Sequence, residues 1–264
     1  FIIQGRASRI ASQGYIDRAS ANMWSYQLQA TYKHDRTIMH LLHFNGHERT
    51  YQAWFGIDSA TLVNNRTFNP AGTDFGQREE PYENEVDDYG QAHYQFHLSR
   101  QIKKHWMLNT TLHYTKGRGY FEQFNVAQPF STYGIPNPVI GNDTLQSTDV
   151  IRRRYLENHF YGLIASAQYK RKNTTLTLGG NWNQYDGLHF GELIWMQYAG
   201  SSQYQDRFYE AGGLKTDASA YVKVLQTLGR KFHLFADVQY RNVGYTIDGN
   251  ELGPRPVFAD ADYH

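Results

Sequence analysis

Three consecutive arginines are the residues whose type and spacing most directly suggest binding chemistry. Arg152, Arg153 and Arg154 end a predicted loop just before a predicted strand. Guanidinium groups bind anionic oxygens through paired hydrogen bonds, so the triplet could hold an anionic chelate or a lipopolysaccharide phosphate. Structural salt bridges to neighbouring loops explain it equally well. The triplet is too short to indicate nucleic-acid binding, and the chain's 26 basic residues are balanced by 25 acidic ones.

Aromatic residues gather in the segment that precedes the triplet, where Phe130 stands among four other aromatic side chains. Exposed rings at the mouth of a binding site would suit a hydrophobic or ring-bearing ligand. Packing of loops against one another is an equally good explanation. The candidate ligand-binding residues are therefore Tyr120, Phe121, Phe124, Tyr133, Arg152, Arg153 and Arg154.

Potential metal ligands do not converge in the sequence. His93 and His97 share one side of a predicted strand, but four strand residues separate them by about 13 Å, too far for one metal ion. The acidic run from Glu79 to Asp88 could bind a cation such as Ca²⁺, although such runs are more often solvated loops. We expect no metal site and no cofactor.

Catalytic motifs are also missing from the sequence, which has no GxSxG elbow, P-loop, dinucleotide fingerprint or HExxH. Glu122 and Glu192 each lie beside aromatic residues, as glycosidase carboxylates do, but no spacing connects them. The absence of cysteine excludes a thiol nucleophile. We expect no catalytic residues and no enzymatic activity.

The region from Tyr89 to Lys116 predicts two strands joined by a basic turn at positions 103–105. Apolar residues alternate with Gln, His, Asn and Thr in both strands. The period of two predicts a sheet with one apolar face and one polar, weakly charged face. In the second strand the apolar face carries Trp106, Leu108, Thr110, Leu112 and Tyr114.

The same alternation recurs along the chain, at positions 1–10, 23–33, 158–170, 174–184, 216–228 and 232–243. A further strand is predicted at positions 37–45, where apolar residues lie on both faces and alternation assigns neither face to lipid. Short basic turns fall near 34–36, 103–105, 171–173 and 229–231, and we expect long loops at 46–88, 117–157 and 185–215. Short turns on one rim and long loops on the other are typical of outer-membrane barrels. We predict an all-β, antiparallel up-and-down sheet of about nine strands, part of a transmembrane β-barrel.

Composition leaves a second interpretation open. Aromatic residues make up 16% of the chain, yet its mean hydropathy is −0.67. Aromatic girdles at two membrane interfaces, together with polar loops, would explain this combination. A tyrosine-rich soluble β protein would show it too, so the alternative is a soluble β-rich carbohydrate-binding module.

Seven segments between Ser8 and Trp195 resemble TonB-dependent outer-membrane receptors, those of Bacteroidetes in particular. They are SRIASQGYIDRAS, ERTYQAWFGI, RTFNPAG, DDYGQAHYQFHLS, LHYTKGRGYFEQF, VIRRRYLENHFYGLIAS and GGNWNQYDGLHFGELIW. The resemblance implies a barrel of about 22 strands closed by an N-terminal plug. It also implies import of an iron chelate, haem, cobalamin or glycan with energy from TonB.

The sequence contains no plug, TonB box or closing strand, so we expect residues 1–264 to be a section of the barrel domain. The implied location is the cell outer membrane. The implied partners are outer-membrane lipid, the TonB complex through the absent N-terminal part, and a small-molecule ligand. An outer-membrane hydrolase that uses Glu192 is the third alternative.

Overall fold

Strands make up nearly all of the computed structural model, which describes residues 1–251 and 261–263. The nine long strands are β1 (Ile2–Ser12), β2 (Ala21–His34), β3 (Thr37–Tyr51), β4 (Val86–Lys103), β5 (Trp106–Pro129), β8 (Ser147–Arg171), β9 (Thr174–Met196), β10 (Arg207–Leu228) and β11 (Phe232–Glu251). The short elements are α1 (Ser59–Asn64), a 3₁₀ turn (Phe130–Tyr133), β6 (Val139–Ile140), β7 (Asp143–Thr144) and β12 (Ala261–Tyr263).

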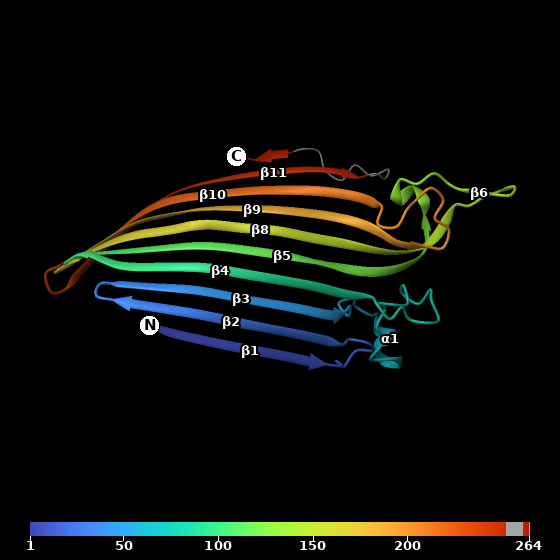
Figure 1. The fold of residues 1–264 in the computed structure, drawn as a ribbon, viewed down its shortest axis with the longest axis horizontal. Coiled ribbons are helices and arrows are strands. Elements are labelled where there is room, and N and C mark those ends of the chain that lie inside the picture. The colour runs from blue at the N-terminus through green and yellow to red at the C-terminus, as the bar shows by residue number, and fades with distance from the viewer. Residues whose placement is uncertain (252–260, 264) are drawn as a thin grey trace.

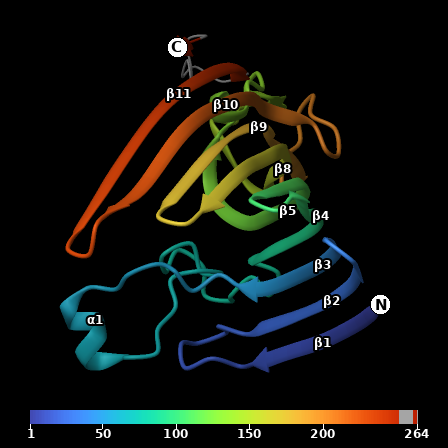
Figure 2. The ribbon, with the colours of Figure 1, turned by 90° about the vertical axis from the view of Figure 1, so that its left-hand side faces the viewer.

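The long strands form one antiparallel sheet in which neighbours in sequence are neighbours in space. Its order is β1-β2-β3-β4-β5-β8-β9-β10-β11-β12, and β6 pairs with β7 in a separate hairpin. In Figure 1 the tight turns lie at one end of the strands, and α1 and the β6 hairpin lie at the other. The sheet is strongly curved (Figure 2), and within the described residues it does not close on itself. The predicted fold class is confirmed.

Tight turns join the hairpins at one edge of the sheet, called here the turn end. Two-residue turns connect β2 to β3 and β8 to β9. Asp35 and Lys172 have φ values of 45° and 46°, and Gly229 has a φ of 66° in the β10–β11 turn. A left-handed backbone conformation in the turn suits short hairpins, because the twist of such a turn matches the twist of the flanking strands.

The predicted loop boundaries are wrong at the opposite edge, called here the loop end. β5 has 24 residues and β8 has 25, so much of the segment 117–157 predicted as loop is strand. β9 and β10 extend in the same way. Charged and aromatic cross-strand pairs, such as Glu122 with Arg153, continue the ladder where apolar alternation has stopped. Pro129 stands at the last position of β5, where proline is tolerated.

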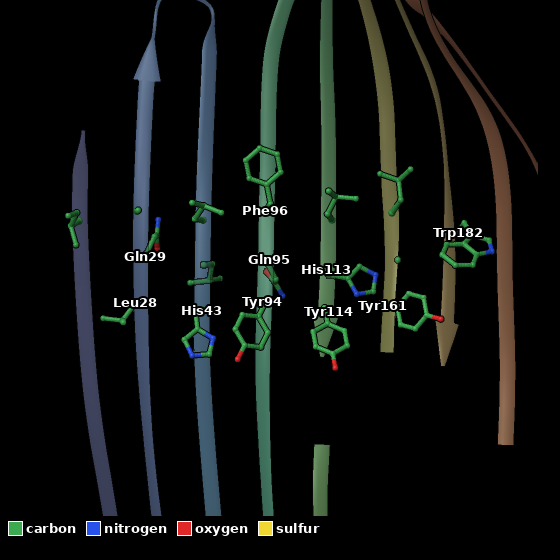
Figure 3. Close-up of a pocket in the computed structure, with 17 residues that line it drawn as sticks. Leu28, Gln29, His43, Tyr94, Gln95, Phe96, His113, Tyr114, Tyr161 and Trp182 are labelled. Atoms are coloured by element: carbon green, nitrogen blue, oxygen red, sulfur yellow. The ribbon is translucent and has the colours of Figure 1, made fainter. Parts of the chain in front are cut away.

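One face of the sheet carries a continuous band of apolar side chains between the turn end and the middle of the strands. Pairing register brings these residues from separate strands into rows, which confirms the faces predicted from alternation in β2, β4, β5, β8 and β9. In β3, where alternation predicted no face, the register places Leu41 and His43 in the band. The band surrounds a shallow groove of about 740 Å³ (Figure 3). Two adjacent rows contain Leu28, His43, Tyr94, Tyr114 and Tyr161, and Ala30, Leu41, Phe96, Leu112, Leu163 and Trp182.

The opposite, polar face is tied together by side-chain hydrogen bonds. His40 lies 2.8 Å from the Thr31 hydroxyl, and His97 lies 3.0 Å from the Thr111 hydroxyl. His113 bonds Asn183 at 2.8 Å, across the intervening strand β8. These histidines therefore have hydroxyl and amide partners, as expected for a wet surface.

Candidate functional site

Five side chains form a cluster at the loop end, on the same side of the strands as the polar face. Phe121 and Gln123 come from β5, and Arg152 and Arg154 come from β8. Trp54, 55% exposed, lies in the segment after β3 and meets Phe121 edge to face at 6.0 Å. We call Trp54, Phe121, Gln123, Arg152 and Arg154 the rim cluster. It combines the exposed Trp54 ring and the half-buried Phe121 ring with two guanidinium groups.

Hydrogen bonds orient the arginine side of the rim cluster. Arg152 Nη2 donates to Gln123 Oε1 at 3.3 Å, and Gln123 Nε2 donates to Gln52 Oε1 at 3.4 Å. The Nε of Arg152 is buried and has no hydrogen-bond partner among the described residues. The Arg154 guanidinium lies 5.9 Å from the centre of the Tyr209 ring. An anionic oxygen placed beside the Nη atoms of Arg152 would accept further hydrogen bonds from its guanidinium group.

Arg153 points to the other face of the sheet, because neighbouring residues of a strand alternate. Its Nε lies 2.5 Å from Glu122 Oε2, and its guanidinium stacks on the Tyr120 ring at 4.2 Å. Glu192 is the next cross-strand partner of Arg153 and lies 3.9 Å from Arg207. Glu122, Arg153, Glu192 and Arg207 thus form a ladder of alternating charge across four strands.

Two of the predicted binding aromatics lie inside the packed loop end. Tyr133 is 3% exposed and packs with Val150 and Phe208. Burial raises the pKa of the Tyr133 hydroxyl, and nearby Arg152 opposes this shift. Phe124 is 8% exposed and lies beneath the Arg78 guanidinium at 3.7 Å. The structure therefore groups Phe121 with Arg152 and Arg154, and separates them from Tyr120, Phe124 and Arg153, whereas Tyr133 is buried close to Arg152.

The acidic run divides into exposed and buried members. Glu79, Glu80 and Glu83 are exposed, whereas Glu85 is 4% exposed and its Oε2 has no hydrogen-bond partner among the described residues. Burial raises the pKa of Glu85 to about 7, against backbone N–H groups of Gly72 and Phe124 that favour its charged form. In the described part of the chain, no three His, Asp or Glu residues are grouped to hold a metal ion.

Sequence reasoning did not identify Gln52, Trp54 and Gln123 as part of a site. Counting strand positions from His113 would have placed Phe121 and Gln123 on the polar face. Trp54 and Gln52 lie in a separate segment, and only the fold brings them to β5.

Solved structures with the same fold are import receptors. No protein-family model and no curated protein sequence matches the chain. The ferric-catecholate import receptor Fiu from E. coli K12 superimposes in its closed form with a TM-score of 0.65 at 10% identity, over 99% of this chain. Its open form gives a TM-score of 0.62 at 10% identity, also over 99% of this chain. BauA, the ferric preacinetobactin receptor from Acinetobacter baumannii, gives 0.58 at 6% identity over 98% of the chain.

The chain spans only about two fifths of these receptor structures, covering 41%, 45% and 38% of their lengths. At this level of identity the likeness establishes the fold, a large antiparallel receptor-type sheet. No helix among the described residues has the length and apolar character needed to cross a membrane, a finding that has no bearing on crossing by β-strands.

Proposed function

We propose that this chain is a section of an outer-membrane receptor barrel that takes up a scarce nutrient with energy from TonB. The observation that carries the proposal is the apolar band on one face of the sheet, bordered by aromatic residues and opposed by a polar face. In a membrane barrel the apolar face contacts lipid and the polar face lines the lumen.

The band from Trp106 to Tyr114 covers most of the height that a bilayer requires. Trp106 near the turn end and Tyr114 in the middle of β5 lie on the same face, eight residues apart. Eight strand residues extend about 26 Å, or about 20 Å along the membrane normal at a tilt of about 40°. The lipid-facing band of such barrels is about 25 Å tall. Trp106 lies 5.2 Å from Tyr169 near the turn end, and Tyr94 stacks on Tyr114 at 6.0 Å in the middle of the strands. Aromatic rings at these two levels would anchor the sheet at the two interfaces.

The rim cluster is the proposed point of ligand capture. Its rings and guanidinium groups suit an anionic, ring-bearing molecule, and the similar structures are receptors for ferric chelates. We therefore propose an iron chelate as the nutrient. Tyr120, Phe124, Tyr133 and Arg153 would support the wall of the site, while Phe121, Arg152 and Arg154 would contact the ligand.

The remaining parts of the receptor would lie outside residues 1–264. A plug would gate the lumen, a TonB-contacting segment would supply energy, and further strands would complete the wall. The outer membrane is the corresponding location. Membership of the Bacteroidetes group of these receptors stays a prediction from sequence resemblance.

The test uses the complete receptor, produced in a strain that lacks its own receptors for iron chelates. We expect heat-modifiable migration, and binding of a ferric tris-catecholate that the variant Arg152→Gln/Arg154→Gln weakens at least about tenfold, as for loss of two charged hydrogen bonds. Arg118→Gln is the matched control, because Arg118 is 62% exposed on the other face. A protein that stays soluble without detergent and binds glycans would instead establish the carbohydrate-binding alternative.

A further inference from the structure

The four tight turns carry an unusual concentration of positive charge. Ten basic residues lie in or beside them, and Asp35 is the single acidic residue in the same stretches. These stretches therefore carry a formal charge of +9, whereas the whole chain carries +1. We call the ten residues the basic rim: Lys33, Arg36, Arg100, Lys103, Lys104, Lys170, Arg171, Lys172, Arg230 and Lys231.

All ten side chains of the basic rim belong to exposed residues. Among the described residues, none of them forms an ion pair with a carboxylate. By contrast, four arginines toward the loop end form ion pairs with carboxylates: Arg49 with Asp88, Arg118 with Glu157, Arg153 with Glu122, and Arg207 with Glu192 and Glu210. The charge of the basic rim is therefore available to an external partner.

The basic rim lies directly beyond the edge of the apolar band that faces the turn end. Trp106 follows the β4–β5 turn within two residues, Tyr169 precedes the β8–β9 turn, and Phe232 follows Lys231 and is 71% exposed. Aromatic residues of this kind mark the boundary between hydrocarbon and headgroups. If the band spans a bilayer, as proposed above, the basic rim reaches the headgroup level of the leaflet at the turn end (Figure 1).

We propose that the basic rim binds anionic phospholipid headgroups, such as phosphatidylglycerol, in that leaflet. Adjacent hairpins repeat every two strands, so the clusters lie about 10 Å apart along the rim. Each turn of the basic rim carries two or three charges, and the turns follow the curvature of the sheet. Separate lipid headgroups can move independently, so one or more can sit beside each turn. The long, flexible Lys and Arg side chains reach phosphate oxygens while their stems rest on the apolar band.

The inference rests on the proposed membrane function. The experiment distinguishes a failure of lipid selectivity from a failure of the proposed function itself. The complete receptor is reconstituted in phosphatidylcholine nanodiscs that contain spin-labelled phosphatidylglycerol or spin-labelled phosphatidylcholine. Electron spin resonance measures the fraction of each lipid that is immobilised on the protein. We expect about threefold selectivity for phosphatidylglycerol at low salt and about none at high salt, because salt screens exposed charges.

The variant Lys103→Gln/Lys104→Gln/Lys170→Gln/Lys172→Gln removes four charges from the two central turns and should abolish most of the selectivity. The control Arg9→Gln/Arg66→Gln/Lys116→Gln/Lys215→Gln removes four exposed charges elsewhere and should retain it. Equal selectivity in both variants would overturn the inference, as would binding of a soluble polyanion through the basic rim without lipid selectivity. Failure to insert into nanodiscs at all would instead count against the proposed function.

Discussion

Arg153 of β8 and Glu122 of β5 are direct cross-strand partners whose side chains meet at 2.5 Å at the loop end. Glu122 is 1% exposed and also accepts hydrogen bonds from the Tyr82 hydroxyl and the Asn84 amide. Burial raises the pKa of Tyr82, and its hydrogen bond to Glu122 raises it further. Glu122 therefore connects the segment before β4, through Tyr82 and Asn84, with the extended parts of β5 and β8.

Removal of one partner should loosen this region strongly. Glu122→Leu leaves Arg153 partly buried without its counter-ion, and we expect a cost of about 3 kcal/mol in the free energy of local opening. The double variant Glu122→Leu/Arg153→Met should recover most of that loss. Native-state hydrogen exchange of β5 and β8 measures both. Glu157→Leu, at the exposed pair with Arg118, is the control and should cost less than about 1 kcal/mol. An equal cost at both sites would contradict the assigned role of burial.

The segment before β4 should become less stable as pH rises from about 4.5 to about 7. Glu85 has a folded pKa of about 7, above the ordinary glutamate pKa of 4.5, because it is buried, and Asp74 adds a smaller effect in the same direction. The folded state then binds more protons than the unfolded state between these two values. Stability is therefore highest below about pH 4.5, falls toward pH 7, and is constant above it, with a total loss of at most about 3 kcal/mol.

Hydrogen exchange of residues 69–86, corrected for intrinsic rates and recorded from pH 5 to 8, measures this change. Glu85→Gln keeps the shape of the side chain without its charge, and should abolish the pH dependence while preserving the low-pH stability. The charged groups that act on Glu85 include Asp74 and Arg18. A pH dependence that persists in Glu85→Gln would assign the effect to another group.

Gly119 should tolerate a methyl group far less well than Gly46, although both lie within long strands. A Cβ on Gly119 would lie 2.4 Å from the backbone oxygen of Asp88 and 2.6 Å from Tyr89 Cα, so the backbone itself would have to shift. A Cβ on Gly46 meets nothing closer than 3.9 Å. We expect Gly119→Ala to cost about 1–3 kcal/mol and Gly46→Ala less than about 1, measured by denaturant unfolding in detergent. Similar losses at both glycines would argue against this packing of β4 on β5.

Opposite effects of the same charge at neighbouring positions would test which face meets lipid. Leu112 is 49% exposed in the apolar band, whereas Thr111 lies on the polar face. Leu112→Lys should reduce insertion into vesicles, because a lysine near the bilayer centre costs about 2–4 kcal/mol. Thr111→Lys should insert almost normally. If Leu112→Lys is harmless and Thr111→Lys is not, the faces are assigned the wrong way round.

Alternation alone was enough to predict the fold where one face is apolar and the other polar. The sequence from Trp106 to Tyr114 has that pattern, and its strand and faces are as predicted. Beyond Lys116 both faces carry charged or aromatic residues, so the pattern ends while the ladder continues. The candidate site was only partly predictable for a related reason. The alternation of side chains along a strand is enough to place Arg152 and Arg154 on one face and Arg153 on the other. The contact of Trp54 with Phe121 joins segments that are distant in sequence, so alternation does not predict it.

The strands differ in length in a regular way across the sheet. β2 and β3 have 14 and 15 residues, whereas β5, β8 and β9 have 24, 25 and 23. By register, Tyr51 at the end of β3 lies level with Glu122 of β5, and β5 continues to Pro129 at the loop end. At about 3.3 Å per residue, the loop end therefore rises by about 20 Å from β3 to β5 and β8. If the sheet forms part of a barrel wall, as proposed above, that wall is taller at β5 and β8 than at β2 and β3, and Arg152 and Arg154 lie on its taller part.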